Sequence, residues 1–345
     1  MSNQPPIEVP QGAIRLNTDS QKLEFFAQDR WYEMATDPAA PSAGRGLFIG
    51  GSPGGTPNYS TNTIDYVNIS TEGDAVDFGD TNYAHFTQAA GLGSKTRAVY
   101  GGGYWPSGNN SINYNTFATQ GNGIDFGDMQ VSKGKRAGFN SRVRGIFAGG
   151  GSDAPNHTKK DEIDFITIDS TGNATDFGNL VAGTDRVIGF SSPTRGITFG
   201  GITGNPGTTV NTVNFVTIAS TGNAIDFGDL VAKRNMSSGA ASNTRGLSLG
   251  GADYPTSGQL DSIEFCTIAT TGNFQEFGDL IYGGRAGGAV SNPIRIVQAQ
   301  GISDPTNRTS MQLVTIATLG DSTAFGDLTL ARNGQAAASN TNGGL

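Results

Sequence analysis

Short stretches in which apolar and polar residues alternate recur along this chain at a nearly constant interval. The plainest is SIEFCTIAT at Ser262–Thr270. Its counterparts begin at Ile64, Ile112, Ile163, Val213 and Met311. Alternation with a period of two predicts antiparallel β-strands with one side buried, and no segment carries a convincing helical period. The pattern therefore predicts an all-β protein.

A tetrapeptide, Asp-Phe-Gly-Asp, follows these stretches and marks a repeat. Its invariant part is Phe-Gly, with the phenylalanines at Phe78, Phe126, Phe177, Phe227, Phe277 and Phe325. The steps of 48 to 51 residues are in the range of four-stranded blade repeats and exceed those of most helical solenoids. Six copies indicate one molecule built from six similar units, so function must come from what differs among them.

The fifth copy shows the expected plan of one repeat. Arg245 opens a short strand that ends in Gly250–Gly251, and a loop rich in Pro, Gly, Asp and Ser leads to the alternating strand. The turn at Thr270–Asn273 predicts a hairpin, because glycine there can take a positive φ. The segments FQEFGD and RAGGAVS supply two further strands. Each repeat therefore predicts four strands.

This arrangement resembles the kelch-type β-propeller, in which an inner strand of small residues begins near an arginine and the next strand ends in Gly-Gly. The matching arginines are Arg136, Arg186, Arg234, Arg285 and Arg332. The matching glycine pairs begin at Gly50, Gly102, Gly149, Gly200 and Gly250. The chain lacks the tryptophan of common kelch units, and its last copy has Gln298–Gly301 in place of Gly-Gly. The resemblance implies a six-bladed β-propeller of four-stranded antiparallel blades over about residues 44–340.

The phase of the repeat predicts how such a ring would close. The chain enters the repeats at the Gly-Gly strand Arg45–Gly51 and leaves them after an inner strand at Arg332–Asn340. The first blade therefore lacks an inner strand, and the C-terminal segment has one to spare. Pairing the two would remove both exposed sheet edges. Ala337, Ala338 and Ser339 are small enough for the crowded centre.

Residues 1–40 stand outside the repeat, and we assign residues 41–345 to the propeller domain. Alternation over Gly12–Met34 predicts a small β-meander that is too short to hold a core alone. The segment Gly12–Trp31, in which GAIRLNTD precedes KLEF and a late tryptophan, resembles a module of bacteriophage tail-fibre and other structural proteins. The repeat sequence TIASTGNAIDFGDL at Thr217–Leu230 resembles propellers of marine and cyanobacterial phages. We expect the apolar side chains of this attachment arm to pack on another chain or on the propeller: Ile14, Leu16, Leu23, Phe25 and Trp31.

The composition limits which ligands and reactions we expect of this chain. The net charge of −8 disfavours nucleic acid as a partner. The chain has one cysteine, Cys266, and two histidines, His85 and His157, which disfavours a transition-metal site. We expect no metal, no cofactor and no enzymatic activity, since no nucleophile–base pair or carboxylate pair stands out from the repeats. No apolar run is long enough for a membrane span, and the first residues do not predict a secretory signal.

The repeated aspartates allow two interpretations. Rings of carboxylates can hold calcium. We favour ion pairs between neighbouring blades, in which Asp128 meets Arg136 and Asp229 meets Arg234. A second arginine series lies beside tight turns and predicts a scaffold role: Arg45, Arg97, Arg144, Arg195, Arg245 and Arg295.

The repeats differ most in the loops between their second and third strands. Recognition is commonly placed on such variable loops of a rigid scaffold. Five side chains in these loops are candidates for binding a carbohydrate or a protein surface: Tyr59, Tyr104, Trp105, His157 and Tyr254. The alternative for Trp105 is that it covers its own blade.

These features lead to a functional hypothesis. We expect a non-enzymatic phage virion protein, made in the host cytoplasm, whose N-terminal arm attaches to other virion proteins. Its propeller would present loops to a glycan or protein of the host surface, and it could form a homo-oligomer in the particle. The alternative hypothesis is a purely structural capsid decoration or tail connector protein. A third hypothesis is a cellular kelch-like interaction scaffold.

Overall fold

The structure is a computed structural model with two compact units, Met1–Ala43 and Gly44–Leu345. It describes residues 9–17, 22–33, 44–54, 60–83, 88–103, 108–151, 158–253 and 258–345. All regular elements within these ranges are β-strands, so the predicted all-β class is confirmed.

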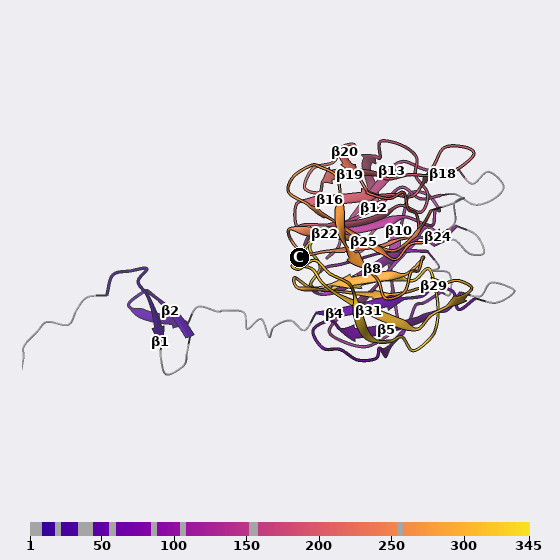
Figure 1. The fold of residues 1–345 in the computed structure, drawn as a ribbon. Helices are drawn as coiled ribbons and strands as arrows, with labels where there is room; N and C mark the ends of the chain where they lie inside the picture. Colours follow the sequence, from indigo (N-terminus) through magenta and orange to yellow (C-terminus); the bar gives the residue numbers. More distant parts are fainter. Residues whose placement is uncertain are drawn as a thin grey trace, which may run out of the picture. The chain divides into compact units, whose positions relative to one another are not determined.

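The first unit contains a three-stranded antiparallel sheet in the order β1-β2-β3 (Figure 1). Its strands are β1 (Ile14–Asn17), β2 (Lys22–Ala27) and β3 (Arg30–Glu33). Gln28 and Asp29 form the turn between β2 and β3 with φ values of 49° and 59°. The small meander predicted for this part of the chain is therefore present.

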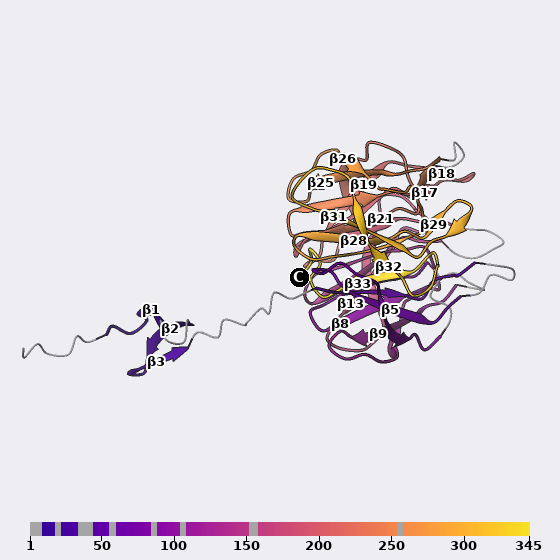
Figure 2. The ribbon, with the colours of Figure 1, turned by 60° about the horizontal axis from the view of Figure 1, so that its bottom comes forward.

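The described residues of the second unit form six four-stranded antiparallel sheets, in which the strands follow one another from first to fourth (Figures 1 and 2). The first strands of sheets 1 to 6 are β33 (Ala336–Ser339), β7 (Ala90–Gly93), β11 (Ala137–Asn140), β15 (Ile188–Ser191), β21 (Ser238–Ala241) and β27 (Gly288–Ser291). The second strands are β4 (Arg45–Ile49), β8 (Arg97–Gly101), β12 (Arg144–Ala148), β16 (Arg195–Phe199), β22 (Arg245–Leu249) and β28 (Arg295–Ala299).

The outer half of each sheet is equally regular. The third strands are β5 (Thr63–Asn68), β9 (Ser111–Thr116), β13 (Glu162–Thr167), β19 (Thr212–Thr217), β25 (Ser262–Thr267) and β31 (Ser310–Thr315). The fourth strands are β6 (Val76–Asp80), β10 (Ile124–Asp128), β14 (Thr175–Asn179), β20 (Ile225–Asp229), β26 (Gln275–Asp279) and β32 (Thr323–Asp327). Repeated four-stranded antiparallel sheets of this kind are consistent with a β-propeller-like fold.

Sheet 1 combines segments from opposite ends of the second unit. β33 pairs antiparallel with β4, with Ala336 opposite Ile49 and Ser339 opposite Gly46. This is the strand pairing that the phase of the repeat predicts.

The core consists of six buried clusters, and each cluster joins apolar side chains of two neighbouring sheets. One phenylalanine of the repeated Phe-Gly lies in every cluster. In sheet 3, Phe177 packs edge-to-face on Phe165 with ring centroids 6.0 Å apart. Full burial of such a ring contributes about 1.5–3 kcal/mol. The invariant phenylalanine is therefore explained by packing between sheets.

The glycine of Phe-Gly is required by the turn of the next repeat. Gly178 has a φ of 145°, and a Cβ at this position would lie 2.5 Å from the carbonyl oxygen of Gly222. The turn is held by three hydrogen bonds: Gly222 N to Phe177 O at 2.8 Å, Ala224 N to Asn179 O at 2.8 Å, and Asn179 N to Asn223 Oδ1 at 3.0 Å. Equivalent bonds join every successive pair of sheets, including sheet 6 to sheet 1 through Phe325 and Gly73.

The second arginine series also joins neighbouring sheets, which confirms its predicted scaffold role. Arg144, at the start of β12, donates a hydrogen bond to the carbonyl of Ile218 in the next sheet at 3.1 Å. Its guanidinium lies over the ring of Phe165, 4.7 Å from the centroid. The other five arginines donate to the corresponding carbonyls of Phe117, Ile168, Ile268, Ile316 and Ser70.

The two kinds of repeated glycine should respond differently to substitution. Gly178→Ala places its Cβ against the turn of the next sheet, whereas Gly172→Ala has a similar φ of 156° but nothing within 4 Å of the added Cβ. We expect Gly178→Ala to lose about 1–3 kcal/mol more stability than Gly172→Ala, because only the former adds a clash to the backbone strain. Urea unfolding of the two variants measures this difference, and equal losses would contradict the steric explanation.

Candidate functional site

The five aromatic and histidine side chains predicted as ligand contacts lie outside the described residues: Tyr59, Tyr104, Trp105, His157 and Tyr254. Their role stays a prediction. The loops of sheets 4 and 6 are described completely and that of sheet 5 in part, each as a hairpin between the second and third strands. These hairpins are β17 (Ile202–Thr203) with β18 (Thr208–Thr209), β23 (Ala252–Asp253) with β24 (Gly258–Gln259), and β29 (Ile302–Ser303) with β30 (Thr306–Asn307).

We call the end of the second unit that carries these hairpins the loop face. In Figure 1, β18, β24 and β29 lie on the right of the second unit and the C-terminus lies on the left; Figure 2 shows β18 and β29 separated from the C-terminus in the same way. Residues just before the first strands bridge to the hairpins, as in Asp185 with Ile202 and Asn235 with Ala252. The entry to each first strand is therefore also on the loop face.

A ring of backbone groups surrounds the centre of this face. The residue two positions before each first strand has a φ between 52° and 66°: Gln88, Lys135, Arg186, Met236, Ala286 and Gly334. Lys135 N donates to Gln88 O at 2.8 Å, Gly334 N to Ala286 O at 2.7 Å, and Gln88 N to Gly334 O at 2.5 Å. Five of the six residues are not glycine, and each carries a conformational cost of order 1–2 kcal/mol. Hydrogen bonds between sheets hold five of the six residues, since Ala286 N also donates to Met236 O at 2.7 Å.

Inside this ring the first strands enclose a series of cavities. A cavity of about 100 Å³ lies at the loop face and is lined by Lys135, Arg186, Ser237 and Gln335 among others. It shares Arg136, Ser237 and Gln335 with a second cavity of about 90 Å³. We call the first of these the loop-face mouth.

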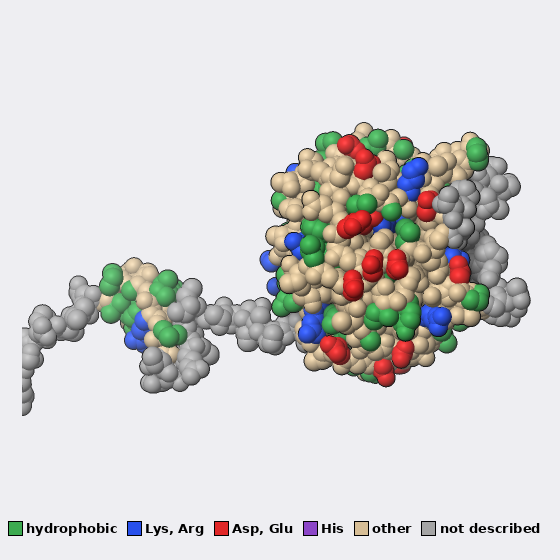
Figure 3. Space-filling model, viewed as in Figure 1, with side chains coloured by type: hydrophobic (Ala, Val, Ile, Leu, Met, Phe, Trp, Pro, Cys, Tyr) green, Lys and Arg blue, Asp and Glu red, His purple; other side chains and the backbone are tan. Residues whose placement is uncertain are grey.

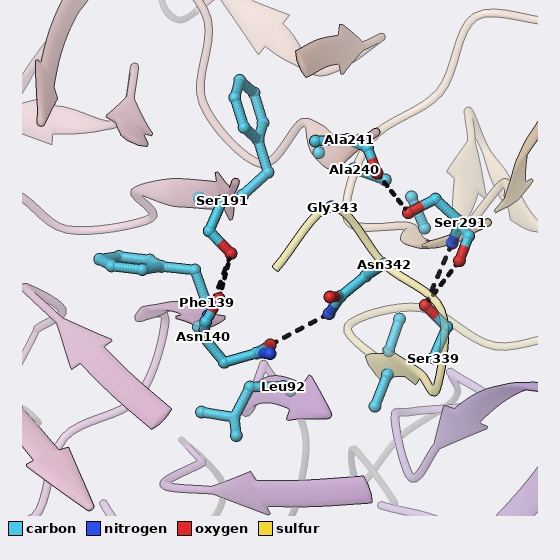
Figure 4. Close-up of a pocket in the computed structure, with 18 residues that line it drawn as sticks. Leu92, Phe139, Asn140, Ser191, Ala240, Ala241, Ser291, Ser339, Asn342 and Gly343 are labelled. Atoms are coloured by element: carbon cyan, nitrogen blue, oxygen red, sulfur yellow. Dashed lines mark hydrogen bonds between the residues drawn. The ribbon is translucent and has the colours of Figure 1, made fainter. Parts of the chain in front are cut away.

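A third cavity, of about 50 Å³, lies at the opposite end of the first strands. Figure 4 shows Asn342 and Gly343 beside the last residues of the first strands. Asn342 Nδ2 donates to Asn140 Oδ1 at 3.0 Å, and Ser339 Oγ donates to Ser291 O at 2.9 Å. The segment after β33 therefore occupies this end, while the loop-face mouth is lined by side chains of several sheets.

Buried ion pairs hold the connections that lead to the first strands. Arg136 Nη2 lies 2.7 Å from Asp164 Oδ2, and Arg332 Nη1 lies 3.1 Å from Asp65 Oδ2. Arg234 pairs with Glu264, and all six side chains are almost completely buried. Burial lowers the pKa of each arginine, and the nearby carboxylate opposes this shift.

These pairs correct two expectations from the sequence. Arg136 and Arg234 were expected to meet Asp128 and Asp229, but their partners are carboxylates of the third strand in their own sheets. The reason is geometric. Asp128 N and Asp229 N are bonded to the turn asparagines of the next sheet, which places these residues at the outer edge, whereas the arginines lie by the first strands.

The five arginines matched to inner strands are also not equivalent to one another. Relative to the start of the first strand, Arg136 is one residue before, Arg186 two, Arg285 three, and Arg234 and Arg332 four. They therefore play different roles. Arg186 belongs to the ring, Arg285 pairs with Asp304 at 2.6 Å, and only some of them reach the third strand.

A polar position in the third strand was missed by the sequence reasoning. The third residue of each third strand is an acid or an amide: Asp65, Asn113, Asp164, Asn214, Glu264 and Gln312. Glu264 accepts hydrogen bonds from the backbone N–H groups of Val231 and Ala232 at 2.8 and 3.0 Å. The restriction to four residue types was visible in the sequence and signals a shared structural role.

The attachment-arm residues do not share one face of their sheet. The pairing of Ile14 with Phe25, and of Phe25 with Tyr32, places these three on one face, with Leu16 beside them. Ile14 is 64% exposed and Leu16 60% exposed, and Figure 3 shows apolar side chains at the surface of this unit. Trp31 lies on the other face, with the Arg15 guanidinium 4.1 Å from its ring centroid. Leu23 belongs to β2, but its side chain lies outside what the structure describes.

Within the residues that the structure describes, no group of three or more His, Cys, Asp or Glu side chains is placed to hold a metal ion. Nor does this part of the chain contain a helix with the length and apolar character to cross a bilayer. Cys266 is buried, and burial raises the pKa of its thiol to about 12.

No family model matches the chain, and no curated protein matches it in sequence.

The pair formed by Arg136 and Asp164 allows a test of the buried charges. Asp164→Leu leaves a buried guanidinium without its carboxylate, and we expect a loss of about 3–5 kcal/mol. Arg136→Met combined with Asp164→Leu should lose clearly less, because both charges are removed together. A double-mutant cycle from urea unfolding measures the coupling, and additive losses would show that the pair has no energetic coupling.

Proposed function

We propose that the six sheets are the blades of a six-bladed β-propeller closed by β33. The support is that sheet 6 is bonded to sheet 1 in the same way as other neighbours are bonded. Arg295 Nη1 donates to Ser70 O at 3.0 Å, and Asp327 N donates to Asp74 Oδ1 at 2.9 Å. The pairing of β33 with β4 supplies the fourth strand that sheet 1 needs.

On this propeller we propose a non-enzymatic binding role, as a phage virion protein that presents its loop face to a host-surface glycan or protein. One observation carries the proposal: the repeated polar groups of the turns and second strands are used to bond one sheet to the next, whereas the loop face is where the repeats differ. A rigid frame with one divergent face is suited to recognition.

The N-terminal unit fits the role of an attachment arm. Its sheet exposes Ile14 and Leu16 on one face, and Phe25 on the same face is partly exposed. Apolar side chains exposed on so small a sheet favour packing against another protein surface. In the proposed virion protein, that surface belongs to a neighbouring subunit of the particle.

The chemistry of the described residues agrees with a non-enzymatic role. The thiol of Cys266 is buried with a raised pKa, so it is poorly suited to act as a nucleophile. Asp65, Asp164 and Glu264 are engaged in ion pairs that hold the connections between sheets. A decoration or connector protein with a purely assembly role is the second candidate, because the exposed arm face alone supports assembly.

Closure by β33 can be tested by truncation. Deleting residues 331–345 removes β33 and Arg332, which exposes the edge of β4 and leaves Asp65 without its cation. We expect oligomerisation, or a melting temperature lower by about 10 °C or more. Deleting only residues 341–345 keeps β33 and serves as the control. A monomer with unchanged melting after the longer deletion would argue against closure.

Binding by the loop face can be tested with the full-length protein on host cells. We expect Trp105→Ala and Tyr254→Ala each to weaken cell binding about tenfold or more while leaving the melting temperature unchanged. Ile294→Ala is the matched control, because Ile294 is exposed in the turn between first and second strands, at the opposite end of the sheets. If the protein binds no host cell or envelope extract and its loop face is covered by neighbours in the virion, the assembly role is the correct one.

A further inference from the structure

The loop-face mouth contains buried polar side chains that have no partner among the described residues. Gln335 is 4% exposed, and neither its amide nitrogen nor its amide oxygen forms a hydrogen bond there. The hydroxyl of Ser237, a residue 2% exposed, also forms no hydrogen bond there, and neither does Oε1 of Gln88. Buried polar groups are ordinarily hydrogen-bonded, so each unpaired one calls for an explanation.

These groups lie at corresponding places around the ring. Gln335 directly follows Gly334 and Ser237 directly follows Met236, so both are the first residues inside the left-handed ring. Both line the loop-face mouth and also the cavity behind it. The corresponding residues of three other sheets, Ala89, Val187 and Gly287, carry no polar side-chain group. Around the mouth, the polar residues Gln335, Arg136 and Ser237 therefore alternate with these three from one sheet to the next.

Three cationic residues, Lys135, Arg136 and Arg186, line the same mouth. The side chain of Lys135 is 7% exposed, and its Nζ lies 3.9 Å from Asp185 Oδ2. Arg186 Nε lies at the same distance from the same carboxylate oxygen. Arg136 also lines the mouth and is already paired with Asp164. The Lys135 and Arg186 cations therefore lie at the same distance from one carboxylate oxygen, in a chain whose net charge is −8.

The apolar part of the lining limits the shape of a ligand. Ala89, Val187, Ile188 and Ala286 contribute to the wall, and the cavity of about 100 Å³ is much smaller than a site for a drug-sized molecule. One edge of a sugar ring with its acid group is the largest portion of a sugar that suits this volume. Its C–H groups would contact the apolar residues that alternate with the polar ones, its hydroxyls would meet Gln335 and Ser237, and its acid group would meet the cations.

We propose that the loop-face mouth binds a small hydroxylated carboxylate with the chemistry of an acidic sugar. This inference rests on the proposed binding role and names the ligand class for that face. The acidic sugar has two sources, a free monosaccharide or the end of a longer glycan, and the same groups would recognise either.

Calorimetric titration of the full-length protein with sodium glucuronate tests the proposal, with glucose and acetate as comparison ligands. We expect glucuronate to bind at low ionic strength, glucose and acetate to bind at least tenfold more weakly, and added salt to weaken the interaction. A glucuronate-terminated oligosaccharide that binds more tightly than the monosaccharide would indicate the glycan as the source, and equal binding would indicate the free sugar.

Variants of residues that line the loop-face mouth test whether glucuronate binds there. Arg186→Gln and Gln335→Leu should each weaken glucuronate binding about tenfold. Arg142→Gln removes the same charge from an exposed turn at the opposite end of the sheets and should bind as the parent does. If Gln335→Leu does not fold, Arg186→Gln still tests the proposal. This variant is expected to fold, because the Arg186 side chain is partly exposed and its Nε lies 3.9 Å from Asp185 Oδ2.

Three results would overturn the proposal: no glucuronate binding at millimolar concentration, acetate binding as tightly as glucuronate, or binding unchanged in Arg186→Gln. The proposed host-binding role fails by a different measurement. If Trp105→Ala abolishes cell binding while glucuronate does not bind, the binding role stands and the acidic-sugar site does not. If glucuronate binding depends on Arg186 but no host cell is bound, the site stands without the host-binding role.

Discussion

The second unit depends on one contact, in which the turn between the third and fourth strands of one sheet is bonded to the fourth strand of the sheet before it. The contact requires a backbone without a side chain at Gly178 and its equivalents, because the carbonyl of the next turn occupies the place of a Cβ. It also brings Phe177 against the following sheet. A four-stranded sheet cannot bury both of its faces alone. Each repeat therefore completes its buried core by packing on the next sheet through this contact.

The two ends of the sheets are built differently as a result. At the end with the second-strand arginines, side chains and turns are uniform because each forms the same bond to a neighbour. At the loop face, the connections are held from inside, by third-strand residues such as Glu264 and Asp65. Because these buried residues hold each connection from its inner side, the outward-facing residues of the connection can differ among repeats. The same division explains how six similar units can provide one surface with distinct chemistry.

The period of the chain and the alternation of apolar residues predicted the strands and the pairing of β33 with β4, because these depend on local pattern. The partners of Arg136 and Arg234 were not predicted correctly, since they depend on which segments the fold brings together. The ring before the first strands was missed for another reason. Gln88, Lys135, Arg186, Met236 and Ala286 share a backbone conformation that their residue types do not signal. The candidate loop aromatics lie outside the described residues, so their role stays a prediction.

The pairing of β33 with β4 has a consequence for synthesis of the protein. β4 leaves the ribosome about 290 residues before its partner, so the first sheet has an unpaired edge until translation of the second unit is nearly complete. Exposed strand edges template association between chains, and contacts this distant in sequence form slowly. Sheets 2 to 6 are each continuous in sequence and can form as they emerge. Sheet 1 must wait, so the time between its two halves is the period of greatest risk for misassembly between nascent chains.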